Sequence, residues 1–211
     1  MPDIGKLKRG TKMKLYYSPS SPYARKVRIV AAEKRLTSRI EEIATSPFES
    51  TAESMALSAA NPLRKIPTLV LDDGTAIYGS QVICEYFDQI GEGPMLIPHD
   101  VAERARRLTI AAMADGILDA AFNIVMERRR PPENRSEFWI ERWSSNVERA
   151  MCALSMHLTN EFQLHDIIAI CSIDYLNFRL ADCYSPTSDI RKWRSGYATR
   201  PSIADTMPRD L

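Results

Sequence analysis

The first ninety residues combine short apolar runs, typical of strands, with segments in which apolar residues recur at helical spacing. Residues 14–17 form the first run, and a turn-rich stretch of serines and prolines follows at 18–22. From 24 to 34 the apolar residues fall on one face of a helix. Ser21 followed by Pro22 suits its start, since serine is a favoured N-cap and proline a favoured first residue. We therefore predict a strand, a tight turn and a helix.

A hairpin and a second helix are predicted further along the chain. Residues 68–71 and 75–78 are β-prone runs on either side of Asp-Gly at 73–74, a strong signal for a two-residue hairpin turn. The apolar residues that follow have the 3.6-residue period of a helix, which we expect Ser80 to cap. With a weaker strand at 39–43 and space for a helix before the hairpin, the predicted order is β-α-β-(α)-β-β-α.

Beyond residue 100 the pattern is helical throughout. Two stripes of apolar residues at helical spacing run through 108–125 and 139–158, and Ser136 is placed to open the second helix. Residues 166–180 are apolar on nearly all sides, which predicts a buried central helix, and 191–197 form a short last helix.

Composition places the boundaries between these parts. Residues 1–12 are polar and are interpreted as an N-terminal tail. Residues 13–92 form the α/β domain, and 101–211 form an all-α helical bundle. The connecting segment, 93–100, contains glycine and proline and is predicted to be a linker.

Charge and cysteine usage exclude several functional classes. Lys and Arg number 28 against 27 Asp and Glu, a net charge of +1, which gives no reason to expect nucleic acid as a partner. The four cysteines lack the spacing of a metal site, and Cys84, Cys152 and Cys171 lie in apolar helical surroundings. We interpret these three as buried reduced thiols of a cytoplasmic protein. There is no secretory signal, and the apolar stretch 167–173 is too short to span a membrane.

The turn before the first helix has groups that suit a thiolate. A β-α-β-β-α unit with a polar turn at this point matches the thioredoxin-like layout, in which the turn carries the reactive cysteine of redox enzymes. Ser21 occupies that position here, and its hydroxyl can donate a hydrogen bond to a thiolate. The helix N-terminus adds N–H groups and partial positive charge, which lower the pKa of a thiol. Alternatively, Ser21 serves only as an N-cap.

Two other segments carry groups suited to a peptide-like ligand. Pro67 follows Lys65 and Ile66 at the start of a strand, and the sequence alone favours a trans peptide bond there. A cis bond would turn the N–H and C=O of Ile66 outward, where they could pair with a ligand backbone. Ser80 and Gln81 open the second helix, whose N-terminus suits a carboxylate, or they serve for capping alone.

Several blocks of the sequence resemble the cytosolic glutathione S-transferase family. Blocks of the first domain that resemble its N-terminal domain are SPYARKVRI (21–29), NPLRKIPTLV (61–70) and DDGTAIYGSQVICEYFD (72–88). Blocks that resemble the helical domain of bacterial members are ADGILDAAFNIVMERRRP (114–131), DIIAICSIDYLNFR (166–179) and RPSIADTMP (200–208). The resemblance implies a thioredoxin-like α/β N-terminal domain, an all-α C-terminal helical bundle and a homodimer.

The resemblance also implies which group activates the thiol. Ser21 matches the serine that activates glutathione in serine-type members of the family. Ser18 and Ser20 offer rival hydroxyls in the same turn, and Tyr16 and Tyr17 are near enough in sequence to suggest tyrosine-type members. The activating residue therefore stays open between these groups.

Further residues match the positions that hold glutathione in the family. Lys65 matches the basic residue that reaches the glycyl carboxylate, and Ile66 the residue whose backbone pairs with the cysteinyl part. Pro67 matches a cis-proline. Ser80, with Gln81 beside it, matches the residue that binds the γ-glutamyl carboxylate.

One position departs from the family pattern. The family usually has Glu or Asp just before the equivalent of Ser80, where it holds the γ-glutamyl amine, and this chain has Gly79. Loss of such a charge-assisted contact removes about 1.5–3 kcal/mol. We therefore expect this chain to bind glutathione weakly.

The second substrate is expected to bind near the helical bundle. Asp115 lies on an apolar stripe, where a carboxylate is out of place unless it faces a cleft or a partner. We expect it to line the pocket with Tyr23, Met113 and Phe122, although a hydrogen-bonded place at a domain or dimer interface is the alternative.

The sequence thus predicts a detoxifying glutathione transferase with a small hydrophobic electrophile as second substrate. Glutathione is the co-substrate, and we expect no metal, no nucleic acid and no membrane as partners. Two alternatives stay open. One is another glutathione-dependent enzyme, such as a peroxidase, dehalogenase or isomerase, and the other is a non-catalytic binding protein on the same fold.

Overall fold

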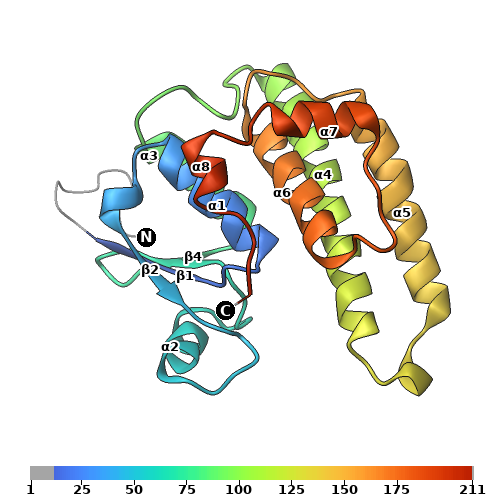
Figure 1. Cartoon of the computed structure of the whole chain (residues 1–211). Helices are drawn as coiled ribbons and strands as arrows, with labels where there is room; N and C mark the ends of the chain where they lie inside the picture. The colour runs from blue at the N-terminus through green and yellow to red at the C-terminus, as the bar shows by residue number, and fades with distance from the viewer. Residues whose placement is uncertain (1–11, 211) are drawn as a thin grey trace. The chain divides into compact units, whose positions relative to one another are not determined.

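The computed structural model describes residues 12–210, and these residues form two compact units (Figure 1). The first unit runs to Met95 and takes in the last segment of the chain, from Pro201 on. The helical unit spans Leu96–Arg200. The predicted change from an α/β part to an all-α part is confirmed.

The first unit contains a four-stranded mixed sheet in the order β2-β1-β3-β4. Its strands are β1 (Met13–Tyr17), β2 (Ile40–Ala44), β3 (Thr68–Val70) and β4 (Ala76–Tyr78). β1 is parallel to β2 and antiparallel to β3, and β3 and β4 form the predicted hairpin. The turn between them has Gly74 at φ +85°, a left-handed conformation that glycine adopts without strain. All four predicted strands are confirmed.

Helices complete the first unit. They are α1 (Pro22–Glu33), α2 (Ala52–Ala60), α3 (Ser80–Ile90) and the short α8 (Pro201–Ala204), together with a turn of 3₁₀ helix at Thr37–Arg39. α1 packs against α3, and α8 packs against α1 (Figure 1). Val27 and Val30 of α1 are fully buried, as are Ile83 and Phe87 of α3. These apolar faces form the core beside the sheet.

A buried ion pair joins the C-terminal ends of α1 and α3. The Lys34 ammonium lies 3.1 Å from the Asp88 carboxylate, and both side chains are 1% exposed. The ammonium also donates a hydrogen bond to the Pro94 carbonyl (3.1 Å). A Cβ on Gly91 would lie 2.4 Å from the Lys34 Cβ, so only glycine allows this close approach. The contact holds the two helices in one arrangement.

The final segment lies in the first unit, whereas the predicted helical domain included it up to residue 211. The reason is a set of contacts to α1. Arg25, which is 2% exposed, donates hydrogen bonds to the Thr206 hydroxyl and the Ile203 carbonyl (3.4 Å each). The backbone N–H of Arg209 donates to the Pro19 carbonyl (3.4 Å), in the turn before α1.

The helical unit consists of long helices around one buried helix. Its elements are α4 (Val101–Arg128), α5 (Glu137–Ser155), α6 (Leu164–Arg179) and α7 (Ser188–Ser195), with a 3₁₀ turn at Pro132–Asn134. α4 packs against both α5 and α6. Every residue of α6 from Leu164 to Leu176 is buried, which confirms the predicted central helix. The Ser172 hydroxyl donates to the Ala114 carbonyl of α4 (2.9 Å).

Parts of the two predicted apolar stripes are wrong. Ala112 of α4 is exposed, although Ala111, Leu118 and Val125 are buried. In α5 the buried face consists of Val147, Met151 and Leu154. The predicted burial of Cys152 is therefore incorrect: Cys152 follows Met151 directly, and successive residues of a helix point about 100° apart, so its side chain lies away from the buried face. Trp139 is 45% exposed and stacks on Trp143 (ring centroids 5.5 Å apart) instead of entering the core.

Among the described residues, α4 alone is long and apolar enough to cross a membrane by length and composition. That is weak evidence for a membrane span, because core helices of globular proteins meet the same criteria. α4 packs along two other helices of its unit.

Candidate functional site

The start of α1 presents the Ser21 hydroxyl together with helical N–H groups. Ser21 is the N-cap, as predicted, and its Oγ accepts a hydrogen bond from the N–H of Ala24 (3.2 Å). Its own N–H donates to the Ser18 carbonyl (3.0 Å), which closes the turn. Because the Ala24 bond uses only a lone pair, the hydroxyl proton can be donated to a ligand. The first turn of α1 has no acidic residue that would repel an anion.

The rival groups are placed differently. The Ser18 and Ser20 hydroxyls lie 3.1 Å apart and hydrogen bond to each other, and Ser18 is 7% exposed. Tyr16 is buried, and the Tyr17 ring lies 4.7 Å from the Arg28 guanidinium. Ser21 is therefore the hydroxyl that lies directly at the N-terminus of α1. Its role stays a prediction.

The loop before β3 presents a free backbone edge. The peptide bond between Ile66 and Pro67 is cis, as the family resemblance implied. The Asn61 amide donates to the Lys65 carbonyl (3.1 Å) and the Thr68 hydroxyl (2.9 Å), and this hydroxyl donates to the same carbonyl (2.8 Å). Within the described part of the chain, the N–H and C=O of Ile66 have no hydrogen-bond partner. They are placed to pair with an extended peptide-like ligand.

The start of α3 corrects one prediction. Gly79, not Ser80, is the N-cap, at φ +91° and ψ 112°, and no side chain caps the helix. The reason is that glycine adopts this left-handed conformation freely, so the helix begins one residue earlier than expected. Ser80 is the first helical residue, and its hydroxyl makes no hydrogen bond to any described residue. Gln81 donates to the Glu85 carboxylate one turn along α3 (3.3 Å).

The predicted lining of the second-substrate pocket is divided between the units. Tyr23 lies in α1 of the first unit, while Met113, Asp115 and Phe122 lie in α4. All four are partly buried. Asp115 and Phe122 are seven residues apart and share one face of α4, whereas Met113 lies about half a turn around the helix. The pocket itself stays a prediction, with Asp115 and Phe122 as its best-matched pair in α4.

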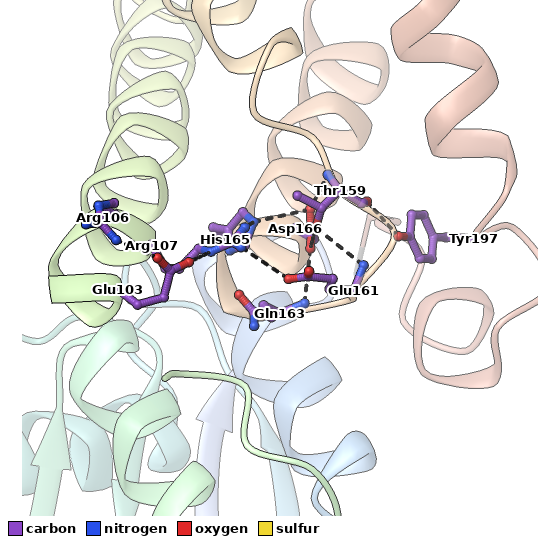
Figure 2. A network of polar contacts seen from close by, with 9 residues as sticks. All are labelled: Glu103, Arg106, Arg107, Thr159, Glu161, Gln163, His165, Asp166 and Tyr197. Atoms are coloured by element: carbon purple, nitrogen blue, oxygen red, sulfur yellow. Dashed lines mark hydrogen bonds and ion pairs between the residues drawn. The ribbon is translucent and has the colours of Figure 1, made fainter. Parts of the chain in front are cut away.

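Sequence reasoning missed the extent of a polar network around the start of α6 (Figure 2). Asp166, fully buried, accepts hydrogen bonds from the Thr159 N–H (3.2 Å), the Thr159 hydroxyl (2.9 Å) and the Gln163 N–H (3.1 Å). The Thr159 carbonyl in turn accepts from the Trp193 indole (2.7 Å) and the Tyr197 hydroxyl (3.0 Å). The local signal for this network was Asp166, which lies three residues after the N-cap, Gln163.

The network also contains a buried histidine, His165, whose pKa is shifted by its surroundings. Its side chain is 1% exposed, and its Nε2 lies 3.6 Å from Asp166 Oδ1 and 3.5 Å from the Arg107 guanidinium (Figure 2). Burial lowers the pKa of His165, and the negative charge of Asp166 opposes this shift. The network joins the start of α6 to α4 and to the segment after α7, so its role is structural.

The described residues contain no group of three or more histidine, cysteine, aspartate or glutamate side chains that could hold a metal ion.

Comparisons with known proteins identify relatives that match most of the chain. The family model for the glutathione S-transferase N-terminal domain matches residues 20–90. An uncharacterized GST-like protein of Escherichia coli K12, YibF, is 34% identical over 173 residues, which cover 79% of this chain and 83% of YibF. A stringent starvation protein A homolog of Haemophilus ducreyi is 34% identical over 82% of this chain and 71% of its own length.

A similar solved structure contains the predicted co-substrate. It is a glutathione transferase family member from Pseudomonas fluorescens Pf-5 with bound glutathione. The two chains share 36% identity with a TM-score of 0.87, over 94% of this chain and all of the other.

Proposed function

Since this chain belongs to the glutathione S-transferase family, we propose that it is a glutathione transferase in which Ser21 stabilises the glutathione thiolate. The observation that carries the proposal is the placement of the Ser21 hydroxyl at the N-terminus of α1, with its proton available to a ligand. A negatively charged sulfur there would accept a hydrogen bond from this hydroxyl and face the partial positive charge of the helix. Both effects lower the pKa of the bound thiol.

The remaining predicted residues fit the rest of the tripeptide. The N–H and C=O of Ile66, which have no partner among the described residues, suit the cysteinyl backbone of glutathione. The two backbones would form two hydrogen bonds, as in the pairing of adjacent strands. The exposed Lys65 ammonium lies next in the chain and suits the glycyl carboxylate. Ser80 and Gln81 in the first turn of α3 suit the γ-glutamyl carboxylate, because N–H groups at a helix start bind anions.

The proposed reaction is attack of the thiolate on a small hydrophobic electrophile. The sulfur forms a bond to an electrophilic carbon, the leaving group departs with its electron pair, and the thiol proton passes to solvent. Binding would supply proximity, and Ser21 would keep the sulfur ionised. We propose that Asp115 and Phe122 of α4 contribute to the second-substrate pocket. We also propose that the protein is a cytoplasmic homodimer with a role in detoxification.

Replacement of Ser21 by alanine tests the proposal. A hydrogen bond to a charged group contributes about 1.5–3 kcal/mol, so we expect a rise of about 1–2 in the pKa of bound glutathione. The thiolate absorbance at 240 nm as a function of pH measures this value, and conjugation of chlorodinitrobenzene should fall about ten- to hundredfold at neutral pH. Ser20→Ala is the matched control in the same turn. An unchanged thiol pKa in Ser21→Ala and a raised one in the control would transfer the role to Ser20.

A non-catalytic binding protein is the second candidate function. One observation favours it: the position just before Ser80 is Gly79, which lacks the carboxylate that usually holds the γ-glutamyl amine in the family. Thermal unfolding with 10 mM glutathione separates the two. If the protein is a transferase, glutathione should raise its unfolding temperature and it should conjugate chlorodinitrobenzene. If glutathione has no such effect and no conjugation occurs, the protein is a non-catalytic binding protein. Turnover of hydroperoxides without aryl halides would identify a different glutathione-dependent enzyme.

A further inference from the structure

The helical unit contains a cavity of about 260 Å³ that none of the proposed glutathione-binding groups line. It lies between α5, the segment that follows α6, and the start of α7. Its walls mix apolar, hydroxyl and thiol groups, and the lining residues include Met151, Cys152, Ser155, Cys183, Tyr184 and Ile190.

Both exposed cysteines of the chain border this cavity. Cys152 lies on α5 and Cys183 follows α6, whereas Cys84 and Cys171 are buried elsewhere in the core. A smaller adjoining pocket is lined by Cys183 together with Glu148, which is one helical turn before Cys152. Cys183 therefore lies near the same stretch of α5 that carries Cys152, and both residues line one cavity.

The segment that carries Cys183 is held by contacts to the end of α6 and to α4. The N–H of Cys183 donates to the Leu180 carbonyl at the end of α6 (3.1 Å), and its thiol also points to this carbonyl (3.4 Å). The neighbouring Asp182 carboxylate accepts a two-pronged hydrogen bond from Arg128 of α4 (2.9 and 3.1 Å). These contacts hold Cys183, which is exposed, at the border of the cavity.

We propose that Cys152 and Cys183 are a redox-active pair that forms a disulfide across this cavity when oxidised glutathione is in excess. The Cys152 thiolate attacks one sulfur of glutathione disulfide and releases one glutathione, which leaves a mixed disulfide on Cys152. The Cys183 thiolate then attacks the Cys152 sulfur and releases the second glutathione. The protein loses two electrons and two thiol protons, and one glutathione disulfide becomes two glutathione molecules.

The order of attack follows from the surroundings of the two thiols. Cys152 is exposed on α5, where a bulky disulfide can reach it. Partial burial raises the pKa of Cys183, so this thiol keeps its proton longer and makes the poorer first nucleophile. Once Cys152 carries glutathione, Cys183 attacks from within the same cavity.

The bridge would tether α5 to the end of the central helix. It would close a loop that contains all of α6 and would restrict the unfolded chain, which stabilises the protein in the oxidised form. We expect the unfolding temperature of the oxidised protein to exceed that of the reduced protein by several degrees.

Mass spectrometry of the full chain tests the pair. The protein is incubated with glutathione disulfide, alkylated with N-ethylmaleimide and digested without reductant. We expect a cross-linked peptide that joins Cys152 to Cys183, while Cys84 and Cys171 react only after unfolding. Cys183→Ser should stop at the mixed disulfide on Cys152, and Cys152→Ser should not form it. A mixed disulfide that persists in the wild-type protein, free thiols at both sites, or a cross-link to a buried cysteine would overturn the proposal.

Discussion

Replacement of Asp88 by asparagine tests the buried ion pair that holds α1 against α3. The two charged side chains are 1% exposed, and Lys34 Nζ lies 3.1 Å from Asp88 Oδ1. Removal of one partner of a buried pair costs about 3–5 kcal/mol, because the remaining charge is left uncompensated. Lys34 keeps its hydrogen bond to the Pro94 carbonyl (3.1 Å), so we expect the lower end, about 3 kcal/mol. For a chain of this length that lowers the unfolding temperature by about 6–12 °C.

Urea unfolding followed by circular dichroism measures the change, with a nearby exposed pair as control. Arg35 and Glu92 lie 3.6 Å apart at the same helix ends, but their side chains are 76% and 77% exposed. Glu92→Gln should therefore change stability by less than about 1 kcal/mol. The double variant Lys34→Met/Asp88→Leu removes both buried charges and should recover most of the loss seen in Asp88→Asn. A loss of stability in Asp88→Asn no larger than that in Glu92→Gln, or a double variant less stable than Asp88→Asn, would show that the buried pair does not stabilise the protein in this way.

Three further changes test other parts of the structure. Burial lowers the pKa of His165, so the unfolded chain binds the proton more readily than the folded protein. The free energy of unfolding should therefore decrease as the pH falls below about 6.5. His165→Asn should reduce this decrease between pH 7 and 5, whereas the control His157→Asn, at an exposed position, should not. Gly79→Glu should tighten glutathione binding about tenfold in calorimetry, because it adds a carboxylate that can pair with the γ-glutamyl amine. The same variant should unfold at a lower temperature, because glutamate is strained at the φ of +91° that Gly79 adopts. Thr206→Val removes an acceptor for the buried arginine of α1 and should cost about 1 kcal/mol in urea unfolding, unlike exposed Thr109→Val.

Elements with strong local signals could be predicted from the sequence. Ser21 and Pro22 indicated the start of α1 correctly. Asp73 and Gly74 indicated the β3–β4 hairpin turn, in which the Asp73 carboxylate accepts a hydrogen bond from the Thr75 N–H (2.8 Å). α2 was not predicted with its bounds, because only Ser54 and Leu57 of its nine residues are buried and its apolar period is weak. Local periodicity determines an element only when one of its faces is deeply buried.

Contacts between distant parts of the sequence could not be predicted in this way. Arg25 and Thr206 are 181 residues apart, so no local pattern indicates that the last segment packs on α1. The exposure of Cys152 depends on which face of α5 meets its neighbours, and a single 100° turn reverses the prediction. The start of α3 was placed one residue late, because serine and glycine are both accepted at an N-cap and the left-handed φ of Gly79 is not visible in the sequence.

The candidate site depends on backbone groups more than on side chains. The N-termini of α1 and α3 have N–H groups without helical partners, and the N–H and C=O of Ile66 have no hydrogen-bond partner among residues 12–210. Separate contacts support these elements: the Ser21 cap at the start of α1, the Asn61 amide in the loop before β3, and the buried pair that joins the far ends of α1 and α3. If these backbone groups supply most of the affinity for glutathione, Ser21→Ala should change the ionisation and reaction of the thiol much more than the binding of the tripeptide. Equal losses in kcat and in glutathione affinity would instead mean that the hydroxyl itself anchors the ligand.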